Sequence, residues 1–403
     1  MNKKLKVLVV DDSLVYRNIL SRAVEKSSIA VVDCTASNGA IALERLEQRS
    51  IDVVLLDVFM PQMDGIETLK KIKEKHSHIP VIMISSGGED GAKTTVTALR
   101  EGAMDFILKP TFGDTQSNME HISRQLNLLF SQILLDKYLV PGQAVRPSTE
   151  VAAHVTKVDY KDDVKEDWGH QDAMIQVKDI TKDPAIDIPE NQKPEKIKKH
   201  LDISYSYKLP LLKGVDVIVM AASTGGPNAV EEVCKALGEE FSKPILLVQH
   251  MPPDFTRIFA EFLAKKVSIQ VKEAQEGDKI LGGRLLIAPG GYHMIVNPDF
   301  TVSITDDEPV NGVKPAADAL FRSVARAYAG KRVLAVTLTG MGNDGTEGIR
   351  ALKRACQCYS ITQSERTSVI YGMPRSVDEA GLSDESVDLK DMGTRIKEIS
   401  RGR

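Results

Sequence analysis

The chain has 403 residues, which is too many for one ordinary domain of roughly 150 residues. Hydrophobic residues make up 42% and charged residues 27%, a composition typical of globular domains with real cores, which excludes a chain that is disordered throughout. The formal net charge is −4, so the chain lacks the basic surplus typical of nucleic-acid-binding proteins. We therefore predict two to three globular domains that do not bind nucleic acid.

Neither a membrane span nor a disulfide framework is predicted. No run of about 18 apolar residues occurs, and acidic residues follow the N-terminal apolar run at once, which favours a first strand over a signal peptide. The chain has four cysteines and no CxxC pair, which is typical of a reducing compartment. We expect a cytoplasmic protein without direct membrane insertion. The cysteines are Cys34, Cys234, Cys356 and Cys358.

Residues 1–138 alternate between apolar runs and amphipathic stretches. Strands are predicted at residues 5–10, 31–36, 53–56, 81–84 and 106–108. Helices are predicted at residues 14–24, 40–46, 66–72, 94–99 and 122–135. Five strands alternating with five helices predict a doubly wound, five-stranded parallel sheet of α/β class. Its ligand site is expected at the carboxyl ends of the strands.

Residues 139–210 lose this periodicity. The stretches KDDVKEDWGHQD and PENQKPEKIKKH are dense in charge and poor in large apolar residues. Such a composition cannot bury a core, so we predict a charged, flexible linker.

Periodicity returns in residues 211–403. Strands are predicted at residues 215–221, 245–248, 285–288 and 333–338, and helices at residues 229–237, 255–264, 317–327 and 349–355. The stretch 285–305 contains Pro-Gly-Gly and Asn-Pro-Asp turns, which favour a β-meander. We predict a second, mostly parallel α/β domain with this meander.

Polar side chains end the predicted strands of the first domain. Asp11 and Asp12 follow the first strand, Asp57 the third, Ser85 the fourth and Lys109 the fifth. Three crowded carboxylates repel one another and favour a bound cation, and hard oxygen ligands suit Mg²⁺. A hydroxyl and an ammonium at the same edge suit a phosphoryl group. We predict an Mg²⁺ site with Asp57 as phosphoryl acceptor, rather than polar residues that merely end strands.

These motifs resemble the receiver domain of two-component response regulators. The matching stretches are VVDDS, LLDVFMPQMDG, ISS and FILKP. The resemblance implies that Asp57 is phosphorylated, that Mg²⁺ is held with Asp11 and Asp12, and that Ser85 and Lys109 report the phosphoryl group. Phe106 stands where such domains carry a switch aromatic, although a plain core phenylalanine explains it equally well.

A serine lies on a small-residue turn of the second domain. The strand at 215–221 leads into Ala-Ser-Thr-Gly-Gly-Pro and then a helix, which places Ser223 near a helix N-terminus and free backbone N–H groups. This setting suits a nucleophile with an oxyanion site, but the glycines could equally cradle an anion. The motif alone leaves both possibilities open.

A histidine and an aspartate follow two other strands of this domain. His250 ends the strand at 245–248, and Asp344 lies on the glycine-rich turn after the strand at 333–338. We predict that the three meet at one edge, with His250 as general base and Asp344 holding its imidazole. Asp344 could also cap the helix that follows it. His293, inside the predicted meander, is expected to be structural or to line the substrate site.

The second domain resembles the catalytic domain of chemotaxis protein-glutamate methylesterases, the CheB family. The matching stretches are AASTGGP, VQHMPPDFT, EAQEGDKI, IAPGGYHM, LTGMGNDG and TQSERTSVIYGMPRS. The resemblance implies Ser223 as nucleophile, His250 as base and Asp344 as orienter, with the backbone around Thr224 and Met341 binding the tetrahedral intermediate. No cofactor is expected in this domain. The linker is longer and more charged than is usual in the family.

The two resemblances together imply a phosphorylation-activated esterase of chemotaxis adaptation. It would hydrolyse glutamyl methyl esters on methyl-accepting chemoreceptors, releasing methanol, and deamidate specific receptor glutamines. A chemotaxis histidine kinase would supply the phosphoryl group. Two alternatives are a response regulator whose second domain binds DNA or a nucleotide, and a receiver fused to an inert scaffold. No helix-turn-helix unit or basic face supports a DNA-binding output.

Overall fold

The computed structural model describes residues 4–110, 115–138 and 214–402. The linker predicted at residues 139–210 lies outside these described residues.

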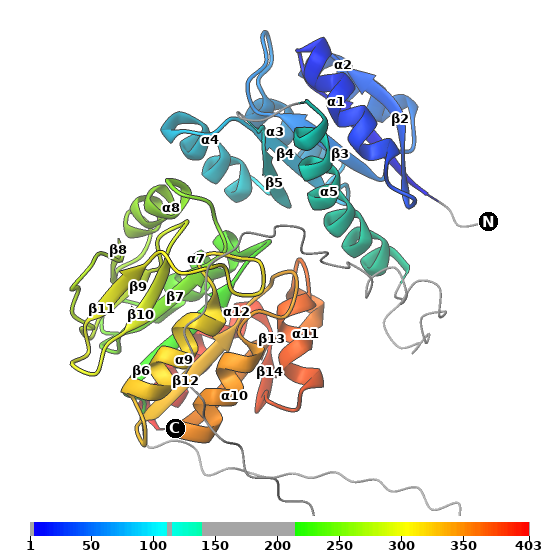
Figure 1. The fold of residues 1–403 in the computed structure, drawn as a ribbon. Helices are drawn as coiled ribbons and strands as arrows, with labels where there is room; N and C mark the ends of the chain where they lie inside the picture. The colour runs from blue at the N-terminus through cyan, green and yellow to red at the C-terminus, as the bar shows by residue number, and fades with distance from the viewer. Residues whose placement is uncertain (1–3, 111–114, 139–213, 403) are drawn as a thin grey trace, which may run out of the picture. The chain divides into compact units, whose positions relative to one another are not determined.

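The N-terminal region is a five-stranded parallel sheet in the order β2-β1-β3-β4-β5, with helices around it (Figure 1). The strands are β1 (Leu5–Val10), β2 (Ala30–Ala36), β3 (Val53–Asp57), β4 (Val81–Ser85) and β5 (Asp105–Leu108). The helices are α1 (Leu14–Glu25), α2 (Gly39–Gln48), α3 (Gly65–Lys75), α4 (Glu89–Arg100) and α5 (Thr115–Tyr138). The predicted doubly wound, five-stranded architecture is confirmed.

Local sequence explains why these elements form where they do. Every residue of β3 and β4 is buried, as expected for strands of a parallel sheet covered on both faces. Three helices begin at side-chain caps, in which Ser13, Asn38 and Asp64 each accept a hydrogen bond from a backbone N–H three residues on. The strand order reverses between β1 and β3, so the carboxyl ends of these strands flank the crevice in which such sheets bind ligands.

The C-terminal region has a seven-stranded sheet in the order β14-β13-β12-β6-β7-β9-β8, in which every neighbouring pair is parallel. The strands are β6 (Val217–Ala222), β7 (Ile245–Gln249), β8 (Gln270–Glu273), β9 (Arg284–Ile287), β12 (Arg332–Thr337), β13 (Gln357–Gln363) and β14 (Glu385–Val387). The helices are α7 (Gly226–Leu237), α8 (Phe255–Ala264), α9 (Ala317–Ala327), α10 (Thr346–Ala355), η1 (Glu365–Thr367), α11 (Gly372–Glu379) and α12 (Leu389–Arg401).

Alternate residues of the central strand β6 face two different layers of helices. Val219 and Ala221 pack in the cluster that holds α9, α10 and α11, whereas Ile218 and Met220 pack with α7, α8 and α12. The run of apolar residues that marked β6 in the sequence therefore reflects burial on both faces of the sheet.

The predicted β-meander needs a correction. β9 belongs to the main parallel sheet, whereas β10 (His293–Val296) and β11 (Val302–Thr305) pair only with each other as an antiparallel hairpin. The turn residues marked the hairpin correctly, but the pattern of residues 285–305 does not show that the chain leaves the sheet after β9. The edge strands β8 and β14, and β13 beside β14, are half-exposed, polar or short, and periodicity did not reveal them.

Among the helices that the structure describes, none combines the length and the apolar character that crossing a membrane would require.

Candidate functional site

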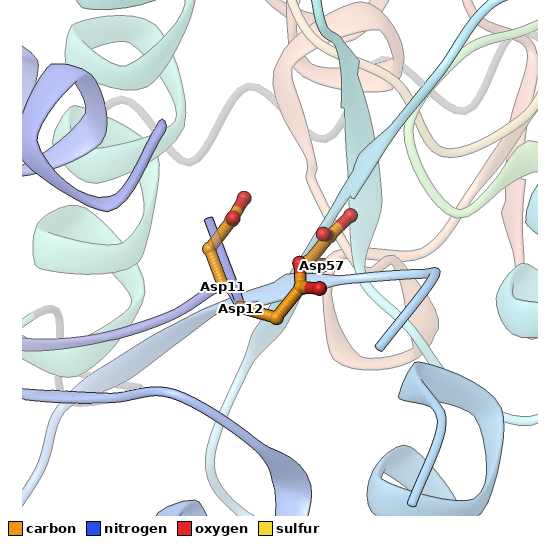
Figure 2. Close-up of side chains that lie close together, drawn as sticks. All are labelled: Asp11, Asp12 and Asp57. Atoms are coloured by element: carbon orange, nitrogen blue, oxygen red, sulfur yellow. The ribbon is translucent and has the colours of Figure 1, made fainter. Parts of the chain in front are cut away.

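Three carboxylates gather at the carboxyl ends of β1 and β3 in the N-terminal region. One carboxylate oxygen each from Asp11, Asp12 and Asp57 lies within 4.8 Å of the others, and Figure 2 shows the three side chains side by side. Asp11 and Asp57 are buried, while Asp12 is exposed. The three acidic side chains therefore form one cluster, as the sequence predicted.

Lys109 places a positive charge beside this acidic cluster. Its ammonium donates a hydrogen bond of 2.8 Å to Asp57 Oδ2 and lies 2.9 Å from Asp11 Oδ2. That Asp11 oxygen is buried, and among the described residues its contact with Lys109 is the one polar contact it makes. A buried carboxylate oxygen that shares one ammonium with Asp57, beside two further carboxylates, leaves room for a hard divalent cation with oxygen ligands.

The protonation of Asp57 is governed by its burial. Desolvation raises the pKa of this carboxyl from 3.8 to about 6, and the charge of Asp11 acts in the same direction, while the ammonium of Lys109 opposes both. Burial alone would lower the pKa of Lys109, but its contacts with the two carboxylates outweigh burial and raise it. The cluster therefore carries an unfavourable excess of negative charge that a further cation would relieve.

Ser85 and Phe106 lie where the sequence predicted, but the Ser85 hydroxyl is not turned to Asp57. It donates toward the carbonyls of Ser86 and Gly91, at 3.1 and 3.4 Å, and accepts a 2.6 Å bond from Thr95 of α4. Phe106 lies on β5, which pairs with β4. The hydroxyl is thus coupled to α4 rather than to the acidic cluster.

In the C-terminal region, Ser223 follows β6 at the centre of the sheet. Its backbone N–H donates to the Thr339 carbonyl at 3.0 Å, and its carbonyl accepts bonds from the Gly226 N–H at 2.8 Å and the Gln249 amide at 2.9 Å. Gly225, at the N-cap of α7, has φ +76°, which glycine adopts without strain. Ser223 is therefore fixed by its backbone, and its hydroxyl makes no hydrogen bond within the described part of the chain.

The loop after β12 lies against Ser223. A Cβ at Gly340 would come within 2.8 Å of Ser223 Cβ, so only glycine allows this approach. The Thr339 hydroxyl donates to the Thr224 carbonyl at 3.0 Å. The structure thus brings the segments around Thr224 and Met341 together at Ser223, where the sequence predicted an oxyanion site.

His250 and Asp344 are joined at the same edge. The imidazole Nε2 lies 2.8 Å from Asp344 Oδ2, and the His250 backbone N–H donates to Ala222, the residue before Ser223, at 3.0 Å. The predicted His–Asp contact is therefore present. No hydrogen bond joins the imidazole to the Ser223 hydroxyl among the residues described, so that contact stays a prediction.

Asp344 is held by more than the imidazole. Its oxygens also accept bonds from the backbone N–H groups of Ala317 at 2.6 Å and Asp318 at 3.0 Å, and from the Asn311 amide at 2.9 Å. Burial would raise the pKa of this carboxyl, but its bonds to His250 and to the two N–H groups outweigh burial and lower it. A buried aspartate kept ionised can hold an imidazole in one tautomer and stabilise its protonated form.

Comparisons with known proteins show the family to which the chain belongs. Residues 218–396 match the CheB methylesterase family and residues 7–120 the response regulator receiver domain. A protein-glutamate methylesterase/protein-glutamine glutaminase of Treponema denticola is 35% identical over 98% of this chain and 98% of its own length. The chain belongs to the protein-glutamate methylesterase/protein-glutamine glutaminase family.

Two further relatives of this methylesterase family illustrate the similarity. Protein-glutamate methylesterase/protein-glutamine glutaminase 2 of Koribacter versatilis is 36% identical, over 96% of this chain and 93% of its own length. The crystal structure of the Thermotoga maritima CheB methylesterase catalytic domain is 34% identical, with a TM-score of 0.44, and covers 46% of this chain and 99% of that one.

In this member of the methylesterase family, sequence reasoning missed several polar residues around the site. Gln249 supports the Ser223 backbone, and Asn311 and Asp318 surround Asp344. A glutamine at the end of a buried strand was a usable signal, because buried polar side chains need partners. Nothing in the sequence indicates that Asn311, in a loop 33 residues before Asp344, contacts it.

His293 proves to be structural, one of the two roles expected for it. It is buried on β10, where Nδ1 accepts a bond from the Ala316 N–H at 3.2 Å and Nε2 lies 3.1 Å from the Glu308 carbonyl. Because Nδ1 is an acceptor, Nε2 carries the proton and donates it to Glu308. The imidazole therefore links the two ends of the loop that carries Asn311.

Proposed function

We propose that this chain is a phosphorylation-activated enzyme that hydrolyses glutamyl methyl esters on methyl-accepting chemoreceptors and deamidates specific receptor glutamines in chemotaxis adaptation. The observation that carries this proposal is the buried Asp344 carboxylate bonded to His250, at the edge where Ser223 follows the neighbouring strand. Its relatives bear the names of both activities.

The mechanism follows from which imidazole nitrogen faces Asp344. Since Nε2–H is donated to the carboxylate, Nδ1 is the nitrogen left to act as base. Nδ1 would take the proton of the Ser223 hydroxyl as the oxygen attacks the glutamyl γ-carbonyl carbon. The imidazolium formed would then be stabilised by Asp344.

Two leaving groups share this scheme. Collapse of the tetrahedral intermediate would break the bond to methoxide or to the amide nitrogen, and His250 would return the proton, so that methanol or ammonia departs. Water would then attack the Ser223 acyl ester by the reverse proton transfers and restore the hydroxyl. The backbone N–H groups around Thr224 and Met341 would stabilise the oxyanion.

The N-terminal region would act as the receiver. Asp11, Asp12 and Asp57 would hold Mg²⁺, which when bound would neutralise charge on the incoming phosphoryl group. Asp57 would accept the phosphoryl group from a chemotaxis histidine kinase, and Lys109 would pair with it. Ser85, tied to α4 through Thr95, would report phosphorylation together with Phe106.

The predicted linker joins the two regions, so the receiver could control the esterase activity of the C-terminal region. We propose that the unphosphorylated receiver rests over the Ser223 edge and blocks bulky receptor helices, and that phosphorylation of Asp57 loosens this block. The intact chain should then release methanol faster after phosphorylation, whereas Asp57→Asn should not respond.

Methanol release from methylated receptor membranes tests the activity directly. The wild-type chain should release methanol, and Ser223→Ala should reduce the rate to the background level. Methanol release that survives Ser223→Ala, or a wild-type chain that releases none under phosphorylating conditions, would refute the proposed function.

A further inference from the structure

A second buried aspartate lies beside Asp344, and a single side chain joins the two. Asp344 and Asp318 are 3% and 2% exposed, and the Asn311 amide donates to Asp344 Oδ1 and to Asp318 Oδ2, each at 2.9 Å. An amide nitrogen carries two hydrogens, so one goes to each carboxylate. Asn311 therefore bridges the two acids with its full donor capacity.

The loop around Asn311 is built to present this amide. Asn311 has φ +56°, a left-handed conformation that asparagine tolerates better than most residues. Val310 and Val313 pair across the turn, and His293 binds Glu308 and Ala316 on either side of it. The amide is thus held in place before any substrate binds.

The two carboxylates have different surroundings. Asp344 has three partners besides Asn311, namely His250 and the N–H groups of Ala317 and Asp318. Asp318 has the Gly348 N–H at 2.6 Å, and Arg322 lies 4.0 Å away. Burial and the charge of Asp344 raise the pKa of Asp318, against the bonds from Asn311 and Gly348. Each acid therefore disfavours the charge of the other.

We propose that Asn311 is a positioning residue for the esterase reaction: its amide fixes Asp344 toward His250 and screens it from Asp318. This inference rests on the proposed function, because it gives Asn311 its role through the His250–Asp344 pair. Nothing in the geometry brings Asn311 to the reacting atoms, so it acts only through Asp344.

Loss of the Asn311 amide should misplace the Asp344 carboxylate while leaving substrate binding almost unchanged. Asp344 Oδ1 would keep only the Asp318 N–H, and the two carboxylates would face each other with no donor between them. The imidazole would then lose a firmly oriented partner, and small misplacements of catalytic groups cost up to about 100-fold in rate. We expect the turnover number to fall about 10- to 100-fold while KM changes less than about twofold.

The pH dependence of activity should also change on its acidic side. A carboxylate that loses a hydrogen-bond donor is ionised less readily, so the pKa of Asp344 should rise and activity should fall at a higher pH than in the wild type. The charged groups facing Asp344 are His250 and Asp318, with Arg322 beyond Asp318, and the substitution changes none of them.

The experiment compares three variants of the full chain. Asn311→Gly removes the amide and keeps the left-handed backbone available. Asn311→Asp keeps the size of the side chain but replaces the donor with a third carboxylate. Asn297→Ala is the matched control, because its amide also donates two bonds, to Thr301 and Ser303 at 3.1 and 3.0 Å, and neither reaches a carboxylate of the site.

Methanol release, thermal unfolding and the NMR signal of the His250 Nε2 proton are then measured. We expect both Asn311→Gly and Asn311→Asp to have a lower turnover number, to lose activity at a higher pH than the wild type as the pH falls, and to show a weaker His250 Nε2 proton signal. The effects should be larger in Asn311→Asp. Asn297→Ala should keep activity within about twofold. Full turnover and an unchanged pH profile in Asn311→Asp, or an Asn311→Gly variant equal to the control, would overturn the inference.

Failure of the proposed function gives a different result. If the wild-type chain releases no methanol, the esterase assignment fails. If the wild type is active but the Asn311 variants behave as Asn297→Ala does, only the role of Asn311 fails. Should Asn311→Gly not fold, the isosteric aspartate variant and its His250 proton signal decide the question.

Discussion

Nε2 of His250 lies 2.8 Å from Oδ2 of Asp344, so the aspartate engages the nitrogen at the far end of the ring from Cβ. Nδ1, next to the chain, is left without a hydrogen bond among the described residues. The His250 backbone is itself bonded to Ala222, one residue before Ser223. This relationship makes Nδ1 the base that the proposed reaction needs, and it depends on Asp344 staying ionised.

Replacing Asp344 with asparagine should therefore abolish most activity. The amide has one acceptor oxygen where the carboxylate now serves His250 and several donors, so the imidazole would lose its tautomer and its charge partner. We expect turnover to fall by on the order of 10³- to 10⁴-fold, with a loss of about 1–3 kcal/mol in the free energy of unfolding. Methanol release and thermal unfolding measure both effects.

The control for this variant is Asp307→Asn, which changes an exposed carboxylate that makes no side-chain hydrogen bond to any residue the structure describes. It should leave turnover and unfolding unchanged. An Asp344→Asn chain with turnover close to that of Asp307→Asn would show that the His250–Asp344 contact has no part in catalysis.

Gly340 offers a test of the packing around Ser223. An alanine there would place its Cβ 2.4 Å from Met373 Sδ and 2.8 Å from Ser223 Cβ, so the loop or the serine must move. We expect Gly340→Ala to reduce turnover about 10- to 100-fold and to cost about 1–3 kcal/mol of stability. Gly87→Ala is the control, since within the described ranges no residue other than its chain neighbours comes within 4 Å of the added Cβ. Equal turnover in both variants would contradict this account of the site.

The sequence predicted the parts of the site that follow buried strands. Asp57 and Ser223 come directly after apolar runs and His250 comes one residue after such a run, and parallel strands bring such ends to one edge of a sheet. Asp344 was found in the same way, from the glycine-rich turn after its strand. The five-stranded sheet and the strands β6, β7, β9 and β12 of the seven-stranded sheet were predictable for the same reason, because buried strands give strong apolar signals. The strands β8, β13 and β14 were not, because they are half-exposed, polar or short.

The supporting residues were not predictable, for physical reasons. Asn311 reaches Asp344 from a loop whose path depends on His293 and on the hairpin before it. Thr95 lies on a helix, and only the tertiary fold turns its hydroxyl to Ser85. Local periodicity records which face of an element is buried, but not which polar atoms meet across elements.

Divalent cation binding should stabilise the receiver region through Asp12. Because Asp12 is exposed, its removal should cost little folding energy but should take one oxygen ligand from the cluster. At about ten times its dissociation constant, Mg²⁺ would stabilise the wild-type chain by about 1.4 kcal/mol. We expect a rise in the receiver's unfolding temperature with Mg²⁺ that Asp12→Ala largely abolishes. A rise of equal size in Asp12→Ala would exclude Asp12 as a ligand.

The raised pKa of Asp57 gives a stability prediction with a definite sign. The folded carboxyl titrates near 6 and the unfolded one near 3.8, so the folded chain holds this proton more tightly. In metal-free buffer the favourable contribution is complete below about pH 4 and is lost as the pH rises to about 6, by on the order of 2–3 kcal/mol. Asp57→Asn, which carries no charge at any pH, should not show this loss.

Chemical denaturation of the receiver transition between pH 4 and pH 7.5, with a chelator present, measures the difference between the two chains. Other groups titrate in both chains and cancel in the comparison. Mg²⁺ should reduce the difference at pH 7.5, because a bound cation favours the ionised carboxylate. If the wild type and Asp57→Asn follow parallel curves over this range, Asp57 is ionised throughout, and burial does not control its charge.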